Sequence, residues 1–338
     1  MVIDEFAGRQ ISIVGAGAWG TTLADLIAGQ DYAVRLWCYE PEVAEQITSG
    51  GENSTFLKGI RLSGNIIPTS DCEEALTGAG LVLFVVPSKF FRETARMFGP
   101  YLANGAYVLS ASKGFEVESF KRMTQVMAEE WSDREYSAGV LSGPNLSREI
   151  AARKPAVTLV ASENNELVKT FQQLLSCPHF RVYGSEDVIG TELGGALKNI
   201  YAIAAGIASG LSFGHNTLAS LITRGLKEMV RLGVALGAKE ETFFGASGLG
   251  DLICTGFSEL SRNQTVGRRL AEGDKLDDIL SAMTHVAEGV YTTRAVHNFL
   301  KTADIEMPIA GAVYRVLFEG LDPKAGVQSL MGRSLKAE

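Results

Sequence analysis

The sequence predicts an α/β fold in which a mostly parallel sheet with helices is followed by an all-helical C-terminal part. Two observations lead to this prediction. Short β-rich runs alternate with helical patterns up to about Ile189, and beyond this residue long helical patterns follow without a convincing strand. A chain of 338 residues also has room for two domains, since one domain takes roughly 100–200 residues.

The first part of the chain has the strand–helix alternation that builds right-handed β-α-β units. The expected strands are Gln10–Val14, Ala33–Trp37, Leu81–Val86, Tyr107–Leu109, Ala138–Leu141, Ala156–Ala161 and Arg181–Tyr183. The expected helices between them are Thr21–Ala28, Pro41–Thr48, Ser119–Trp131 and Glu166–Leu175. The first of these helices is followed by Gly29, at the position where glycine commonly ends a helix.

The second part of the chain is expected to be helical throughout. Its predicted helices are Leu193–Leu211, Thr217–Leu236, Asn263–Ala271, Thr292–Thr302, Ile309–Glu319 and Pro323–Met331. The most apolar of them is interrupted by Lys198 and Asn199, so we expect a buried core helix and no membrane span. We place the domain boundary before this helix, with residues 1–189 in the first domain and 190–338 in the second.

Composition excludes several classes of protein. The net charge is −8 and the acidic residues are spread along the chain, which argues against a nucleic-acid binder. The four cysteines are widely spaced and the four histidines are scattered, so we expect neither a disulfide framework nor a metal site. The start of the chain carries Asp4 and Glu5 where a secretory signal carries basic residues. These features predict a cytoplasmic protein.

A glycine-rich turn is the most informative motif. The run from Ile11 to Val14 leads into Gly15-Ala16-Gly17-Ala18-Trp19-Gly20, which is Gly-x-Gly-x-x-Gly between a strand and a helix. In such a turn the first glycine makes the tight bend, the second lets the backbone approach a pyrophosphate, and the third lets the helix pack close to the sheet. The helix start offers N–H groups to the phosphates. This context predicts a Rossmann-like domain that binds NAD or NADP.

Two residues near the second strand bear on the choice of cofactor. Glu40 follows that strand, where an acid accepts hydrogen bonds from the adenosine ribose and repels a 2′-phosphate. An exposed glutamate at the start of the next helix is an alternative explanation. Arg35 would favour NADP if it pointed to the same place. We therefore expect a modest preference for NAD.

Lys198 is the candidate for chemistry. On a helix, Gly194 and Gly195 lie on its face, which predicts a small pocket beside the ammonium where a substrate fits. Apolar neighbours would desolvate the ammonium and lower its pKa towards the range useful for proton transfer. A lysine that reaches from a core helix to water is the competing interpretation.

Further candidates lie in loops and at a helix start. Ser261 and Gln264 have the spacing of a capping box, so the helix beginning at Arg262 is either an anion site to which a guanidinium contributes or an ordinary capped helix with a solvated arginine. Asp251, in a Gly-rich turn, either orients the catalytic lysine or caps a helix. Lys113 and the segment Ser142–Asn145 follow predicted strands, at the edge where parallel sheets bind ligands.

Together these segments resemble the bacterial type of NAD(P)-dependent glycerol-3-phosphate dehydrogenase over nearly the whole chain. The motifs in order are the Gly-x-Gly-x-Trp-Gly turn, Val85-Val86-Pro87-Ser88, Lys113-Gly114-Phe115, Ser142-Gly143-Pro144-Asn145, Leu197-Lys198-Asn199, Gly248-Leu249-Gly250-Asp251-Leu252, Ser261-Arg262-Asn263 and Glu288-Gly289. The resemblance implies reversible reduction of dihydroxyacetone phosphate to sn-glycerol 3-phosphate for phospholipid synthesis, by a homodimer.

The resemblance also implies roles for individual residues. Lys198 matches the proton donor and acceptor. The implied substrate-binding residues are Lys113, Gly143, Asn145, Lys198, Asp251, Ser261, Arg262 and Asn263. The implied cofactor contacts, besides the glycines and Glu40, are Ala18, Trp19, Lys113, Ser147, Arg262, Val286 and Glu288. Asn145 departs from the pattern, since Ser or Thr is usual there.

Two alternative functions are considered for the chain. One is a related dehydrogenase that acts on a hydroxy acid or a ketopantoate-like substrate, and the other is a non-catalytic nucleotide sensor.

Overall fold

The computed structural model describes residues 10–283 and 286–334. The acidic start of the chain and His285 lie outside the described residues. The chain divides into two compact units. Unit 1 comprises the described residues up to Lys113 together with Arg122–Thr191, and unit 2 comprises Gly114–Lys121 together with the described residues from Glu192 onward.

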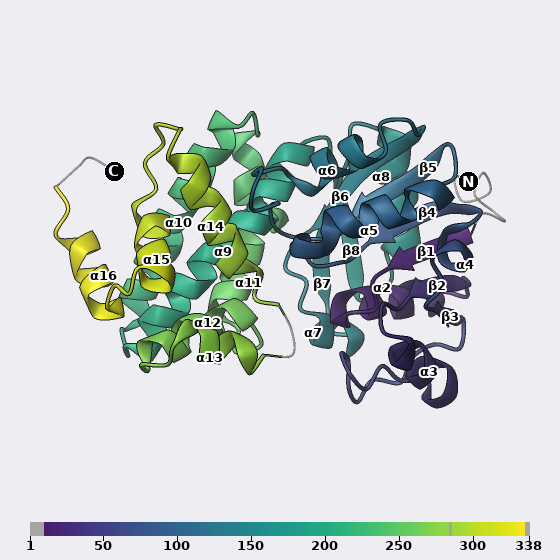
Figure 1. The fold of residues 1–338 in the computed structure, drawn as a ribbon, viewed down its shortest axis with the longest axis horizontal. Coiled ribbons are helices and arrows are strands. Elements are labelled where there is room, and N and C mark those ends of the chain that lie inside the picture. The colour runs from purple at the N-terminus through teal and green to yellow at the C-terminus, as the bar shows by residue number, and fades with distance from the viewer. Residues whose placement is uncertain (1–9, 284–285, 335–338) are drawn as a thin grey trace. The chain divides into compact units, whose positions relative to one another are not determined.

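An eight-stranded sheet forms the centre of unit 1 (Figure 1), in the order β3-β2-β1-β4-β5-β6-β7-β8. The strands are β1 Gln10–Val14, β2 Val34–Trp37, β3 Ile66–Thr69, β4 Ala79–Phe84, β5 Ala106–Ser110, β6 Tyr136–Ser142, β7 Ala156–Ala161 and β8 Phe180–Ser185. Neighbouring strands are parallel except β6 and β7, which are antiparallel. The predicted mostly parallel sheet is therefore confirmed.

The short edge strand β3 is absent from the prediction. Its sequence, Ile66-Ile67-Pro68-Thr69, contains a proline, which donates no backbone hydrogen bond and normally argues against a strand. At the edge of the sheet this argument fails, because β3 needs to pair on only one side. Its partner is β2, in a register that places Trp37 opposite Thr69.

Helices cover both faces of this sheet. They are α2 Ala18–Ala28, α3 Pro41–Gly50, α4 Cys72–Leu76, α5 Phe91–Phe98, α6 Met123–Glu130, α7 Ser147–Ala151 and α8 Asn165–Leu175. One apolar core joins the sheet to α2, α3, α7 and α8, and a second joins it to α4, α5 and α6. In β4, Leu83 belongs to the first core and the adjacent Phe84 to the second, as the alternation of side chains along a buried strand requires.

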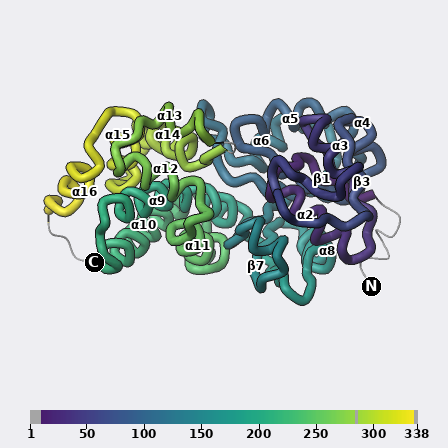
Figure 2. The backbone as a smooth tube through the Cα atoms, turned by 90° about the horizontal axis from the view of Figure 1, so that it is seen from below, coloured from purple at the N-terminus to yellow at the C-terminus, as the bar shows by residue number. Residues whose placement is uncertain are grey.

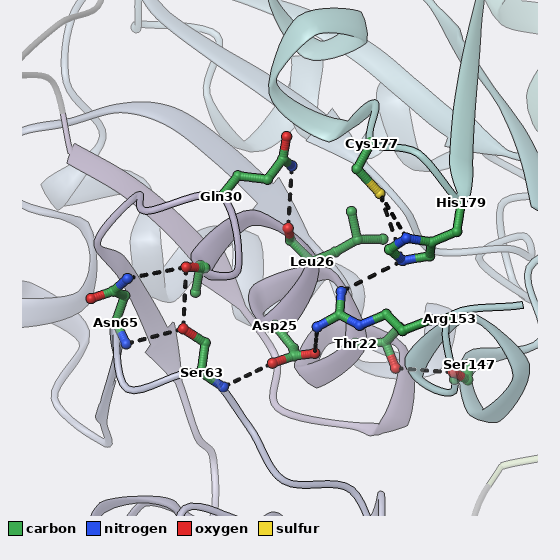
Figure 3. Close-up of polar contacts among 11 residues, drawn as sticks. Thr22, Asp25, Leu26, Gln30, Ser63, Asn65, Ser147, Arg153, Cys177 and His179 are labelled. Carbon is green, nitrogen blue, oxygen red and sulfur yellow. Dashed lines mark hydrogen bonds and ion pairs between the residues drawn. The ribbon is translucent and has the colours of Figure 1, made fainter.

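Polar contacts fix α2, the helix after the glycine-rich turn (Figure 3). The buried carboxylate of Asp25 accepts a hydrogen bond from the Ser63 backbone N–H at 2.8 Å and pairs with Arg153 at 3.1 Å. Arg153 in turn lies 3.5 Å from His179, which contacts the Cys177 thiol at 3.4 Å. These contacts join α2 to the loops that precede β3, β7 and β8, so the helix cannot shift independently of the sheet.

Unit 2 is helical, as predicted (Figure 2). Its helices are α9 Val188–Gly210, whose first turn belongs to unit 1, α10 His215–Ala235, α11 Asp251–Phe257, α12 Arg262–Ala271, α13 Leu276–Ser281, α14 Glu288–Leu300, α15 Pro308–Phe318 and α16 Pro323–Met331. The sequence pattern does not predict α4, α5, α7, α11 or α13, each of which has eight residues or fewer and too little periodicity to detect. Among the described helices, none combines the length and apolarity that a membrane crossing requires.

The segment Gly114–Lys121 packs with unit 2 through aromatic rings. Phe120 stacks between Phe115 and Phe299, with ring centroids 4.5 Å and 4.3 Å apart. Its backbone has a φ of 58°, in the left-handed region, which is incompatible with a right-handed helix. The predicted helix Ser119–Trp131 therefore begins too early, and the observed α6 starts at Met123.

A buried carboxylate joins three helices of unit 2. Glu228, on α10, accepts hydrogen bonds from the Tyr201 hydroxyl of α9 at 3.1 Å and from the backbone N–H groups of Ile309 and Ala310 at the start of α15. Desolvation by burial raises the pKa of Glu228 to about 7, although the backbone hydrogen bonds favour the ionised form. Glu228 is thus an acid that titrates near neutral pH inside the core.

Glu228→Gln should change how stability depends on pH. The raised pKa means that the wild-type carboxyl contributes fully to stability below about pH 4.5, and this contribution is lost as the pH rises through about 7. Glutamine does not titrate, so the free energy of unfolding of the wild type relative to the variant should fall by about 3 kcal/mol across this range. Urea unfolding at a series of pH values measures this difference.

The exposed Glu241→Gln variant is the control for removing one negative charge. A difference between the wild type and Glu228→Gln that stays constant from pH 5 to 8 would show that Glu228 does not titrate in this range.

Candidate active site

The glycine-rich turn between β1 and α2 adopts a conformation that only glycine allows at two positions. Gly15 has a φ of 112°, and a Cβ atom there would lie 2.6 Å from the carbonyl oxygen of Val85. A Cβ atom on Gly20 would lie 1.9 Å from the carbonyl oxygen of Gly15. These close approaches match the tight turn and the close helix packing that the sequence predicts for the two glycines.

Gly17 differs from the other two glycines, because the space beside it is open. It is the N-cap of α2, and apart from the adjoining backbone no described atom lies within 4 Å of the position of an added Cβ. The N-terminus of this eleven-residue helix, at Ala18 and Trp19, offers N–H groups and a positive dipole end. The turn therefore has the free space and the donors that a dinucleotide pyrophosphate needs.

Two charged residues, Arg35 on β2 and Glu40 just after it, are the candidates for contact with the adenosine part of a bound dinucleotide. Glu40 is exposed at the N-cap of α3, and its side chain makes no capping hydrogen bond within the described part of the chain. The guanidinium of Arg35 donates to the backbone carbonyl oxygens of Glu74 and Thr77, around α4. Burial and the negative charge of Glu40 raise the pKa of the Cys38 thiol to about 12. Arg35 is thus held by α4, whereas Glu40 remains exposed.

Lys113 and the loop after β6 form one polar cluster in unit 1. Lys113 donates from Nζ to the carbonyl oxygen of Gly143 at 2.8 Å. The side chain of Asn145 donates from Nδ2 to the Thr158 hydroxyl at 3.0 Å, while its buried Oδ1 has no hydrogen-bond partner among the described residues. Ser147, in the first turn of α7, accepts a hydrogen bond from the Thr22 hydroxyl of α2 through its carbonyl oxygen. The two loops predicted to bind ligands therefore lie together.

Lys198 forms a buried cluster with two side chains of α11 in unit 2. The Nζ atom lies 2.9 Å from Oδ1 of Asp251 and 2.5 Å from the hydroxyl of Thr255. Thr255 also donates to Oδ1 of Asp251 at 3.0 Å. Lys198 is 6% exposed and Asp251 is 1% exposed. The lysine therefore does not reach from the core to water, and of the two roles considered for Asp251 the structure supports orienting Lys198.

Thr255 is not among the site residues predicted from the sequence. It follows Asp251 by four residues, so the two side chains share one face of α11. A helical period from Asp251 through this segment is the signal that would have identified it. The observation matters because Thr255 accepts from the ammonium and donates to the carboxylate, which fixes the direction of both hydrogen bonds.

At Gly194, one of the two glycines predicted to leave a pocket beside Lys198, the structure leaves no such space. A Cβ atom on Gly194 would lie 2.6 Å from the carbonyl oxygen of Ser247 and 3.3 Å from the Cα atom of Gly248. Backbone of the turn before α11 therefore fills the space that the sequence suggested for a substrate. The absence of a side chain lets α9 approach this turn closely, which brings Lys198 within reach of Asp251.

The start of α12 is capped as predicted. The Ser261 hydroxyl accepts a hydrogen bond from the backbone N–H of Gln264 at 3.2 Å. Arg262, the first residue of the helix, keeps part of its surface exposed, yet neighbouring protein atoms desolvate its guanidinium and lower its pKa, an effect that the carboxylate of Glu288 opposes. Arginine remains protonated at neutral pH in such surroundings. The helix start and Arg262 together form a positively charged site.

Asn263 holds helices together through its side chain. Its Nδ2 donates to Oδ1 of Asn199 on α9 at 2.8 Å, and its Oδ1 accepts from the backbone N–H of Gly289 on α14 at 2.9 Å. Glu288, which precedes this glycine, begins α14, and Val286 lies half-buried just before the helix. The family resemblance implies that Asn263 binds the substrate, without specifying its side chain or its backbone. In the structure this side chain connects α9, α12 and α14.

The candidate residues of unit 1 thus lie at the glycine-rich turn, at Lys113 with the loop after β6, and at Glu40. Those of unit 2 lie around Lys198 and at the start of α12, which Asn263 joins to α9. Within the described ranges, no three His, Cys, Asp or Glu side chains come together in a way that could hold a metal ion. The groups available for chemistry are therefore an ammonium, a guanidinium, a carboxylate, hydroxyls and backbone N–H groups.

Comparison with known proteins identifies relatives along almost the whole chain. A family model described as NAD-dependent glycerol-3-phosphate dehydrogenase N-terminus matches residues 10–168, and one described as the C-terminus of that enzyme matches residues 187–328. The glycerol-3-phosphate dehydrogenases [NAD(P)+] of Syntrophotalea carbinolica and Citrifermentans bemidjiense are 46% and 44% identical to the chain. They cover 97% and 98% of it, over 99% of their own length.

Solved structures agree with these relatives. Glycerol-3-phosphate dehydrogenase from Coxiella burnetii has a TM-score of 0.92 at 38% identity, and the match covers 96% of this chain and 99% of that one. The enzyme from Saccharomyces cerevisiae has a TM-score of 0.81 at 27% identity, over 95% and 98%. A ketopantoate reductase from Ralstonia eutropha, at 18% identity and a TM-score of 0.54 over 94% and 99%, shares the fold alone.

Proposed function

The chain belongs to the family of NAD-dependent glycerol-3-phosphate dehydrogenases, and from this premise we propose that Lys198 exchanges a proton with the substrate. The protein is an oxidoreductase with glycerol-3-phosphate dehydrogenase [NAD(P)+] activity. The observation that carries the proposal for Lys198 is its burial against Asp251 and Thr255. A lysine that is buried and held by a carboxylate is oriented for proton transfer, whereas an exposed lysine is not.

The glycine-rich turn is the proposed cofactor site. Gly15 and Gly20 shape it, the open space at Gly17 admits a pyrophosphate, and the first turn of α2 at Ala18 and Trp19 supplies donors. Bound NAD(P)H supplies the hydride for the carbonyl carbon. Lys113, Ser147, Arg262, Val286 and Glu288 are the further residues proposed to contact the cofactor.

Lys198 would act in both directions of the reaction. In ketone reduction its ammonium donates a proton to the oxygen that becomes the hydroxyl at C2 of glycerol 3-phosphate. The transfer leaves a neutral amine beside the buried carboxylate of Asp251, and a buried charge without a counter-charge is unfavourable. Asp251 therefore favours renewed protonation of the amine. In alcohol oxidation the neutral amine accepts the hydroxyl proton.

The phosphate of the substrate is proposed to bind at the start of α12. Arg262 offers a bidentate guanidinium, and the helix N-terminus capped by Ser261 adds backbone donors. Since the Asn263 side chain already joins α9 to α14, its contribution would come from its backbone. Lys113, Gly143 and Asn145 are the residues of unit 1 proposed to bind the substrate, and the unpartnered Oδ1 of Asn145 supports this because a ligand hydroxyl would satisfy it.

NAD is the proposed preferred cofactor. Arg35, the cation of β2 that would favour a 2′-phosphate, is held by the carbonyl oxygens around α4, whereas Glu40 stays exposed. Reduction of dihydroxyacetone phosphate for phospholipid synthesis follows from the family and is part of the proposal. Homodimer formation and a cytoplasmic location stay predictions of the sequence.

Lys198→Met should lower kcat for dihydroxyacetone phosphate by about 10²–10⁴, because the general acid is lost. Methionine keeps the apolar stem, so the dissociation constant of NADH should stay within about twofold of the wild type. Lys301→Met, at the exposed end of α14, is the matched control. Near-normal turnover by the Lys198 variant would refute the assignment.

Arg262→Ala should raise KM for dihydroxyacetone phosphate by about 30–150-fold, the equivalent of a charge-assisted hydrogen-bond pair at about 2–3 kcal/mol. At saturating NADH, which compensates for a lost cofactor contact of Arg262, turnover of unphosphorylated dihydroxyacetone should hardly change, since this ketone has no phosphate for Arg262 to bind. Arg268→Ala, which removes an arginine paired with Glu272 on the same helix, is the control. Equal losses for both ketones would show that Arg262 does not recognise the phosphate.

The kcat/KM should be at least about tenfold higher with NADH than with NADPH, because Glu40 repels a 2′-phosphate. Glu40→Gln should lower the ratio of kcat/KM with NADH to kcat/KM with NADPH. Glu42→Gln, in the first turn of the same helix, should leave it unchanged. A preference of the wild type for NADPH would contradict the proposal.

A further inference from the structure

The connection between α3 and β3 reaches the glycine-rich turn through one buried amide. Asn53 is fully buried. Its Nδ2 donates to the carbonyl oxygen of Ala16 and to the Thr21 hydroxyl, each at 2.8 Å. The Thr21 hydroxyl itself donates to the Ala16 carbonyl oxygen at 3.1 Å. The carbonyl group between the first two glycines of the motif is thus held from two sides.

Asn53 is also tied firmly to its own loop. Its Oδ1 accepts a hydrogen bond from the Phe56 backbone N–H at 3.0 Å, and its carbonyl oxygen accepts from the Leu57 N–H at 2.8 Å. Both donors and the acceptor of the side-chain amide are therefore in use. The bonds to Ala16 and Thr21 span more than thirty residues of sequence, which shows that the loop and the turn depend on each other.

The position of the Ala16 carbonyl group fixes the direction of the Gly17 N–H in the same peptide unit. In a planar trans peptide the C=O and N–H groups point in opposite directions. Because the Ala16 carbonyl points towards Asn53, the N–H of Gly17 points away from it. Gly17 is also the glycine at which the space for a side chain is open. A single peptide unit therefore has its oxygen fixed in the core while its N–H is directed away from the core.

We infer that Asn53 is a positioning residue for the cofactor pyrophosphate. It fixes the Ala16–Gly17 peptide so that the N–H of Gly17 is already directed towards the phosphate oxygens. This inference rests on the proposed cofactor site at the glycine-rich turn. Asn53 does not touch the cofactor; it acts through the backbone, by holding in advance a donor that would otherwise have to be ordered when the cofactor binds.

A purely structural role would have different consequences. An apolar side chain of similar size fills the same volume of a core without the cost of burying an amide. Asn53→Leu therefore keeps approximately the same volume and removes the two donors together with the acceptor of the Phe56 N–H. Thr21→Val is a second, independent variant, because it preserves the branched shape and removes the hydroxyl that also holds Ala16.

The experiment measures binding of ADP-ribose and of adenosine to the full-length variants, by calorimetry and NMR titration. ADP-ribose carries the pyrophosphate, whereas adenosine does not. Asn53→Leu should weaken ADP-ribose binding by about tenfold to a hundredfold, the value of a charge-assisted hydrogen bond, and should change adenosine binding by less than twofold. Thr21→Val should show the same selectivity with a smaller loss.

Asn65→Leu is the matched control, because Asn65 donates from Nδ2 to the carbonyl oxygen of Ala28 at the other end of α2. This variant should bind both ligands as the wild type does. Unchanged ADP-ribose binding in folded Asn53→Leu, or equal losses for the two ligands, would overturn the inference. If Asn53→Leu does not fold, Thr21→Val decides, and a variant that binds both ligands normally would overturn it.

Failure of the cofactor site itself would look different. Gly17→Val places a side chain in the open space and should abolish ADP-ribose binding. If this variant binds ADP-ribose normally, the proposed cofactor site is wrong, whatever the Asn53 variants do.

Discussion

The burial of one ammonium group constrains how α9 packs against the start of α11. Removing Lys198 and Asp251 from water is unfavourable unless the two charges meet with good geometry and their hydrogen bonds are satisfied. The structure meets both conditions, with 2.9 Å between Nζ and Oδ1 and with Thr255 bonded to both groups. The contact requires α9 and the start of α11 to approach closely. Gly194 permits this approach, because the carbonyl oxygen of Ser247 occupies the place of its side chain.

On each of the helices α9, α12 and α14, a charged residue is followed directly by a residue that joins this helix to another of the three. Lys198, Arg262 and Glu288 carry the charges, and the residue after each of them makes the connection. Asn199, Asn263 and Gly289 are joined in series by hydrogen bonds of 2.8 Å and 2.9 Å. Gly289 cannot carry a side chain, since a Cβ would lie 2.6 Å from the carbonyl oxygen of Asn199. The relative positions of the three charged residues are therefore set by backbone and amide contacts, which are stiffer than long side chains.

The sequence predicts those features that are local or periodic. The alternating pattern reveals the buried strands, and the glycine spacing reveals the turn after β1. The sequence does not predict β3, since Pro68 argues against a strand unless that strand is known to lie at the edge of the sheet. It also misinterprets Gly194, because a missing side chain indicates either a ligand or close packing, and only the position of Ser247 distinguishes the two. Thr255 is missed because the sequence predicts no helix over α11, and its spacing of four residues from Asp251 indicates a shared face only on a helix.

The hydrogen bonds of a buried asparagine distinguish an amide that joins parts of the fold from one that faces a ligand. The first kind has partners within the protein for both its oxygen and its nitrogen, whereas the second kind lacks one. In sequence, Asn145 and Asn263 lie in motifs and Asn53 does not, and nothing in the pattern distinguishes an amide that faces a ligand from one that joins parts of the fold. In the structure, the amides of Asn53 and Asn263 are bonded at both their oxygen and their nitrogen within the protein. Asn145 is bonded through Nδ2, but its buried Oδ1 has no partner among the described residues. A buried acceptor without a partner is unfavourable by about 1–3 kcal/mol. A ligand donor would recover this free energy at Asn145, whereas at the other two it would have to displace an existing bond.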